Sequence, residues 1–269
     1  RWRRLMGMKQ ILVMMAAVLV VGCGNKTPET SQSVEAEAQV ASKPTPEPDP
    51  ISPAKEKVIA IADPIVEKVV RKALDKPEGE LTEADLEKVT ELDLRGTKIT
   101  DEGLKELAKL KKLDDLNLSG TKITAMALKD VAKLQSLTSL ILGESLSSSS
   151  VKITNKDLKE VAKLQKLEFL WLWDTKITDL GLKEVAKLQK LKMLSLGYTQ
   201  ITDAGLMEVA KLQKLEYLDL TDTKITDAGL MEVAKLKKLH TLDLSDTQTT
   251  KEGVAELKKA LPNLGILDL

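Results

Sequence analysis

The sequence predicts an α/β solenoid in which short parallel strands alternate with helices. One unit recurs at a nearly fixed period, and it is clearest in KLEYLDLTDTKITDAGLMEVAKL, which begins at Lys214. Its first half alternates apolar and polar residues as a strand does. Its second half spaces apolar residues at helical intervals, as Leu206, Val209 and Leu212 show in the copy before it. A fixed period that joins a strand to a helix is typical of stacked repeats.

Residues 1–23 are predicted to be a lipoprotein signal peptide. Lys9 precedes an uninterrupted apolar run from Ile11 to Val21, which is too short to span a bilayer but suits a secretory signal. Val20-Val21-Gly22-Cys23 resembles the lipobox of bacterial lipoproteins. This resemblance implies that Cys23, the only cysteine, is lipidated and anchors the protein in a membrane of the bacterial cell envelope, outside the cytoplasm. The alternative is an ordinary signal peptide in which Cys23 has no role.

Two segments are expected before the repeats begin. Residues 24–57 are rich in proline, serine and glutamate, which predicts a disordered tether, or alternatively a propeptide that is removed. Residues 58–80 are predicted to form a helical N-terminal cap, because Asp63 is a suitable N-cap, Pro64 suits the first turn and an apolar stripe follows. Such a cap would cover the first layer of a solenoid.

Residues 81–269 are predicted to hold about eight repeats, the last of them truncated. Their aligned leucines are spaced by 24, 24, 30, 24, 24, 24 and 25 residues: Leu92, Leu116, Leu140, Leu170, Leu194, Leu218, Leu242 and Leu267. A threonine column runs beside them and is expected to bond backbone groups where each strand turns: Thr97, Thr121, Thr175, Thr199, Thr223 and Thr247.

This pattern resembles the leucine-rich repeat family, whose members often carry asparagine where this threonine column runs. The stretch KPEGELTEADLEKVTELDL, from Lys76, resembles the N-terminal cap of internalin-like proteins. The resemblance implies a right-handed horseshoe with its parallel strands on the concave face and its helices on the convex face. It also makes a binding surface more probable than a catalytic centre.

Aromatic residues gather on one part of the predicted concave face. Phe169, Trp171 and Trp173 alternate with leucines, so their rings are expected to point away from the core. Met193, Tyr198 and Tyr217 follow in the next two copies. Exposed aromatic side chains are enriched at binding hot spots, so these residues are predicted to bind the ligand. The alternative is that they pack on one another as a small separate core.

An insertion and several acidic residues flank this aromatic group. The insertion, residues 144–151, is expected to loop out, either as a wall of the site or without a role. Asp219, Asp243 and Asp268 are predicted to form a ladder of like charges, with further aspartates at the strand ends: Asp174, Asp222 and Asp246. Asp174, Asp219 and Asp243 are therefore added to the predicted ligand site, since a basic protein surface would neutralise them. A merely soluble acidic face is the alternative.

Composition argues against several other classes of function. His240 is the only histidine and no glycine-rich phosphate loop is present, so no catalytic residues and no cofactor are predicted. A metal site is not predicted either, because no compact loop gathers carboxylates. The formal net charge is zero, which argues against a nucleic-acid partner.

The sequence therefore predicts a lipid-anchored, extracytoplasmic module that binds a protein partner on the concave face of repeats four to six. Recognition of a cell-wall or capsule glycan is the alternative, with Trp171 and Trp173 stacking on sugar rings. A purely structural role in the envelope is a third hypothesis.

Overall fold

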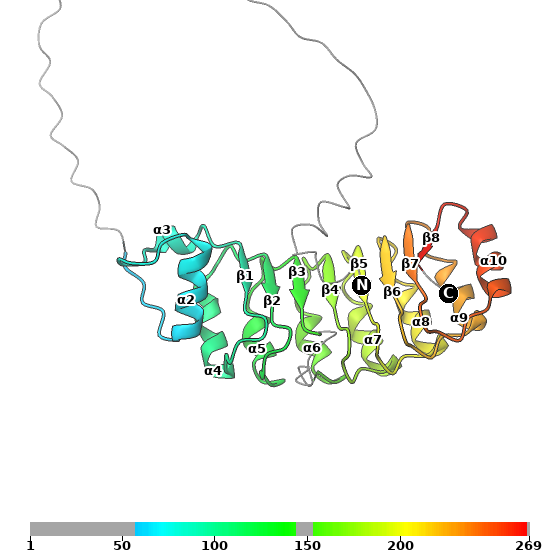
Figure 1. The fold of residues 1–269 in the computed structure, drawn as a ribbon, viewed down its shortest axis with the longest axis horizontal. Helices are drawn as coiled ribbons and strands as arrows, with labels where there is room; N and C mark the ends of the chain where they lie inside the picture. The colour runs from blue at the N-terminus through cyan, green and yellow to red at the C-terminus, as the bar shows by residue number, and fades with distance from the viewer. Residues whose placement is uncertain (1–56, 144–152, 268–269) are drawn as a thin grey trace, which may run out of the picture. The chain divides into compact units, whose positions relative to one another are not determined.

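The computed structural model describes residues 57–143 and 153–267, which form one solenoid body (Figure 1). Its hydrophobic core runs from Ile61 to Leu264. The body therefore has its own core and its own cap, which is what independent folding requires. Cys23, the predicted tether up to residue 56, the insertion and Asp268 lie outside the described residues.

Eight parallel strands form a single sheet in sequence order, as predicted. Each strand has three residues, because the chain leaves the sheet once it has placed one leucine in the core and its two neighbours on the other face. The strands are Glu91–Asp93 (β1), Asp115–Asn117 (β2), Ser139–Ile141 (β3), Phe169–Trp171 (β4), Met193–Ser195 (β5), Tyr217–Asp219 (β6), Thr241–Asp243 (β7) and Gly265–Leu267 (β8).

The predicted register is correct for the first seven strands and wrong for the last. The central leucines from Leu92 to Leu242 are register partners. In β8, however, Ile266 pairs with Leu242 and Leu267 pairs with Asp243. Both registers offer an aliphatic residue to the core, so the apolar pattern could not choose between them. Leu267, and not Asp268, thus occupies the place next to Asp243.

Helices cover one side of the sheet, and in Figure 1 they follow the outer curve of the body. They are Pro64–Ala73 (α2), Glu83–Leu86 (α3), Asp101–Leu104 (α4), Lys105–Lys109 (η2, a 3-10 helix), Leu128–Val131 (α5), Leu158–Val161 (α6), Asp179–Val185 (α7), Asp203–Val209 (α8), Asp227–Val233 (α9) and Lys251–Ala260 (α10). After the cap helix, the α-helices have four residues in the first copies, seven in α7–α9 and ten in α10. In the described part of the chain, none has the length and apolarity of a membrane span.

The predicted cap helix is present as α2. The Asp63 Oδ1 accepts hydrogen bonds from the backbone N–H groups of Ile65 and Val66, at 2.9 and 3.0 Å. Val66 and Val70 are fully buried against the first repeats. The helix therefore begins where the sequence predicts and closes the N-terminal end of the core.

Two polar ladders recur along the repeats: the first lies within each copy, and the second joins each copy to the next. Every hydroxyl of the threonine column donates to the carbonyl three residues earlier, at 2.6–2.7 Å, which confirms its structural role. A second ladder joins neighbouring copies, as when Asp203 accepts from the backbone N–H and the hydroxyl of Thr226. Asn155 takes the same place beside Thr178. These bonds make the sheet a rigid platform for the side chains on its open face.

Candidate functional site: the aromatic strand face

The side of the sheet away from the helices, here called the strand face, carries Phe169 and Trp171 on β4. Leu170 and Leu172 are fully buried, so the two rings point out of the core as predicted. The ring planes are 18° from parallel and their centroids are 6.3 Å apart. Both side chains are half-buried, so they pack on each other and still reach the surface.

A second aromatic pair lies at the end of the strands. The Trp173 and Tyr198 rings are 4.3 Å apart between centroids and tilted by 50°. Gly197 makes room for the indole, because a Cβ at that position would lie 2.4 Å from the Trp173 Nε1. Both neighbouring copies on the C-terminal side carry a hydroxyl residue in place of Gly197, namely Thr221 and Ser245. The copy that begins at β5 is therefore altered to hold this pair.

Tyr198 stands in a column of left-handed backbone conformations. Its other described members are all glycine or aspartate, with φ between 49° and 65°: Gly96, Gly120, Asp174, Asp222 and Asp246. Glycine and aspartate tolerate this conformation, whereas a bulky side chain there is an outlier. Tyr198 has a φ of 57°, is 41% exposed, and is held by its N–H bond to the Thr221 carbonyl at 2.7 Å. The fold thus strains its backbone to present an aromatic ring to solvent.

This column also accounts for the strand-end aspartates. Asp174 was placed in the predicted site for its charge, and Asp174 is indeed exposed. Its positive φ, however, gives the backbone a reason to prefer aspartate at that position. The alignment of Gly96 and Gly120 with three aspartates is the sequence signal for this conformation, because left-handed backbone is what those two residue types share.

The prediction that Met193 is exposed is wrong. Met193 lies between Phe169 and Tyr217 in the sheet register and is buried. Large neighbours on the adjacent strands cover it, so it supports the half-buried Phe169 and Tyr217 from below the surface.

The prediction of an exposed acidic ladder is also wrong, because Asp219 and Asp243 are buried. Asp219 accepts from the N–H and the hydroxyl of Thr221, at 3.0 and 2.6 Å, and from the Ser195 hydroxyl at 2.7 Å. Asp243 accepts from the N–H and the hydroxyl of Ser245. A carboxylate held by such bonds needs no external cation.

The remaining carboxylates on the strand face lie at its N-terminal end. Burial raises the pKa of Asp115 to about 6, the Ser139 hydrogen bond opposes this rise, and the charges of Glu91 and Asp114 add to it. The Asp115 Oδ1 has no hydrogen-bond partner in the described structure. Within residues 57–143 and 153–267, no group of three His, Cys, Asp or Glu side chains is arranged to hold a metal ion.

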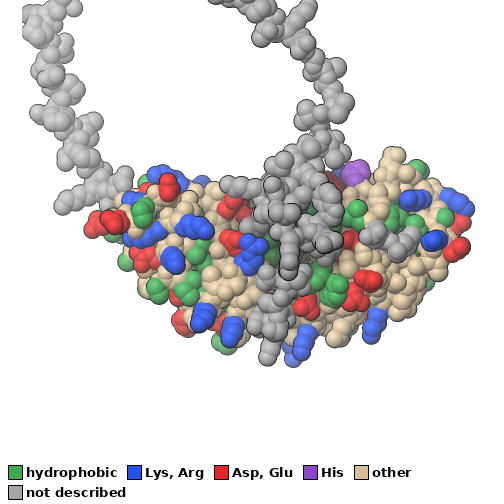
Figure 2. Space-filling view, viewed as in Figure 1, with side chains coloured by type: hydrophobic (Ala, Val, Ile, Leu, Met, Phe, Trp, Pro, Cys, Tyr) green, Lys and Arg blue, Asp and Glu red, His purple; other side chains and the backbone are tan. Residues whose placement is uncertain are grey.

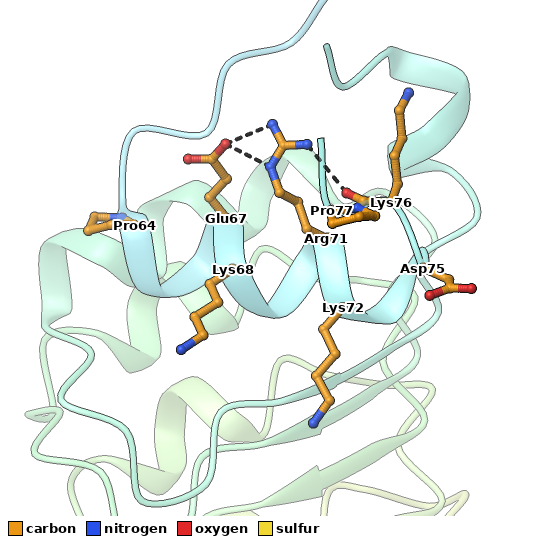
Figure 3. A pocket seen from close by; sticks show the side chains of 8 residues that line it. All are labelled: Pro64, Glu67, Lys68, Arg71, Lys72, Asp75, Lys76 and Pro77. Carbon is orange, nitrogen blue, oxygen red and sulfur yellow. Dashed lines mark hydrogen bonds and ion pairs between the residues drawn. The ribbon is translucent and has the colours of Figure 1, made fainter. Parts of the chain in front are cut away.

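The residues that line a concavity beside the cap helix make contacts that stabilise the fold (Figure 3). Arg71 pairs with Glu67 at 2.9 Å and donates to the carbonyls of Lys76 and Gly79. These bonds tie the end of α2 to the loop that follows.

Elsewhere on the face seen in Figure 2, acidic and basic side chains are interspersed, unlike the clustered basic side chains of a nucleic-acid binder.

Comparison with known proteins agrees with this architecture. The family model described as "Leucine Rich repeat" matches residues 86–108, 187–210 and 211–234. No curated protein sequence matches the chain. The chain contains leucine-rich repeats and folds as an α/β solenoid.

Three similar solved structures come from bacteria. Internalin C2 of Listeria monocytogenes is 26% identical, with a TM-score of 0.55, over 78% of this chain and 94% of that one. An internalin F of the same species is 20% identical, with a TM-score of 0.45, over 77% and 75%. A leucine-rich repeat protein of Leptospira interrogans is 24% identical, with a TM-score of 0.47, over 68% and 50%. Leucine-rich repeat proteins generally mediate protein–protein interaction.

Proposed function

We propose that this protein is a non-enzymatic binding module that recognises a protein partner through the strand face of β4–β6. Cys23 would carry the lipid that anchors it in the bacterial envelope, outside the cytoplasm. The observation that carries the binding proposal is Tyr198, whose exposed ring is held in a conformation that, among the other copies described at this position, is adopted by glycine or aspartate.

The strain at Tyr198 favours a binding role over a packing role. A ring that only filled space would be better placed on a residue with ordinary backbone angles, because the left-handed conformation costs about 1–2 kcal/mol. The tilted contact with Trp173 offsets this cost by about 0.5–1.5 kcal/mol beyond the burial of the ring, but 41% of Tyr198 stays exposed to solvent. Tyrosine and tryptophan are the side chains most enriched at binding hot spots.

The geometry of β4 favours a protein over a sugar. Phe169 and Trp171 lie nearly parallel and side by side, so each covers part of the face that a sugar ring would need. Trp173 and Tyr217 are half-buried and Tyr198 is exposed, so these residues add further aromatic surface to the same face. Such a surface is typical of the centre of a protein interface.

Capture experiments with residues 57–269 test this proposal. The unaltered fragment is immobilised and exposed to an envelope extract, alongside Tyr198→Asp, which installs the residue of the neighbouring copies, and Trp171→Ala. Met126→Ala is the matched control, because Met126 is exposed but lies near α5, on the helical side of the sheet. A protein that is lost with both strand-face variants and kept with the control supports the proposal. Equal capture by all four would refute it, and selective loss of polysaccharide would favour the glycan alternative.

The proposed anchor is tested separately. Cys23→Ala should move the native protein from the membrane fraction to the soluble fraction, and the mass of the wild-type N-terminal peptide should include acyl chains. An unmodified Cys23 in the mature protein would contradict the anchor without affecting the binding proposal.

A further inference from the structure

On the helical side of the solenoid, one exposed position changes from a charged residue to apolar residues along the chain. One exposed helix position carries lysine in four copies, then methionine in two and alanine in the last: Lys105, Lys129, Lys159, Lys183, Met207, Met231 and Ala255. Met207 is 54% exposed and Met231 is 73% exposed. Leu180 on α7 is exposed as well. Lysine evidently suits this position, so solvation and folding do not explain why it becomes methionine on α8 and α9.

A groove runs beside this apolar stripe, between α9 and α10. Its apolar lining includes Leu230, Met231, Ala234 and Leu257. The groove forms because α10 carries Val254 and Ala255 where α9 carries the larger Leu230 and Met231.

The rim of the groove is acidic. Its lining residues, all within the described part of the chain, include three carboxylates and no lysine or arginine. Asp227 is already bonded to Thr250, but the exposed Glu252 has no ion pair within the described residues. Glu256 pairs only with Lys259, and such an exposed pair contributes little and is easily exchanged. The groove thus offers an apolar floor and at least one uncompensated negative charge.

We propose that this groove docks an amphipathic helix of a partner protein, with lysine or arginine flanking the helix's apolar face. An amphipathic helix lays its apolar side into an apolar groove, and methionine-rich surfaces adapt well to such helices. The acidic rim selects the charge of the flanking residues. The site is independent of the proposed function, because it lies on the helical side of the sheet whereas Tyr198 lies on the strand side.

Direct binding of model peptides tests this proposal. Residues 57–269 are titrated into a fluorescently labelled, 18-residue helical peptide of leucine and lysine, and into its leucine–glutamate counterpart, with anisotropy as the readout. We expect the lysine peptide to bind at least about tenfold more tightly than the glutamate peptide, and added salt to weaken it. The double variant Met207→Lys and Met231→Lys, which installs the lysine of the earlier copies, should lose at least about tenfold in affinity.

Met126→Lys is the matched control, because it makes the same exchange at an exposed methionine near α5. It should bind within about twofold of the wild type, and thermal unfolding should show all variants folded. Equal affinity of the double variant and the wild type would overturn the proposal, as would equal affinity for the two peptides. A wild-type dimer in light scattering that the double variant dissociates would also overturn it, because the occupant would then be a second copy of the chain.

Discussion

Tyr198 gives the sharpest test of the link between strain and binding. Tyr198→Ala removes the ring contact with Trp173 but keeps a Cβ in the left-handed conformation, so it should destabilise the fold by at least about 0.5–1.5 kcal/mol, the part of the contact beyond the burial of the ring. Tyr198→Asp loses the same contact, but aspartate adopts the left-handed conformation more readily, which should restore about 0.5–1 kcal/mol of the free energy of unfolding. The aspartate variant should therefore be more stable than the alanine variant. Urea denaturation followed by circular dichroism measures all three.

Asp222→Ala is the control for the backbone part of this reasoning. Asp222 occupies the same column with a φ of 49°, and its N–H bonds the Ser245 carbonyl at 2.8 Å. Its replacement by alanine should cost about 0.5–1 kcal/mol, with no ring contact to lose. If Tyr198→Ala is as stable as Tyr198→Asp, the backbone at this position is not strained and the main argument for the binding site fails.

Three further predictions concern polar groups within and between the repeats. Thr223→Val removes the 2.6 Å hydrogen bond to the Leu220 carbonyl and should cost about 1–2 kcal/mol in urea denaturation, whereas Thr223→Ser should cost less. Burial raises the pKa of Asp115 in the folded state to about 6, above its ordinary value, so its ionised form destabilises the fold and stability falls as the pH rises from about 4 to about 6. Allowing for solvent screening, Asp115→Asn should gain roughly 1–2 kcal/mol at pH 7 and nothing at pH 3, and equal gains at both would contradict this cause. Asp203→Ala should cost about 1–2 kcal/mol, because it leaves the backbone N–H and the hydroxyl of Thr226 in the next copy without their acceptor. Asp203→Asn should cost little in the same assay, since Asn155 already fills that role.

The sequence was sufficient for the fold because each structural rule recurs in every copy. A leucine at a fixed period predicted the strand register, and Asp63 followed by Pro64 predicted the start of α2. The register of the last strand, β8, was predicted wrongly, since Ile266 and Leu267 satisfy the same pattern equally well.

The site was predicted less well, because exposure depends on neighbours that are distant in sequence. Met193 alternates as a surface residue does, but the aromatic side chains on both adjacent strands bury it. Asp219 resembles a surface charge in the sequence, and only the fold shows that Ser195 of the preceding copy bonds it. Left-handed backbone at Tyr198 is likewise invisible to a pattern of apolar and polar residues.

In a repeat protein, each irregular residue can be compared with the residues at the same position in the neighbouring copies. Where one copy carries a residue that the fold tolerates less well than the residue of its neighbours, packing cannot be the reason for the difference. Tyr198 meets this test on the strand face, because its neighbours in the column are aspartates. Met207 and Met231 meet it on the helical side, because earlier copies place lysine there. The departures fall in consecutive copies and on opposite sides of one rigid sheet, so a partner bound to one side leaves the other side free. If both proposals are correct, the two proposed sites lie on opposite sides of the sheet and two partners can bind at once.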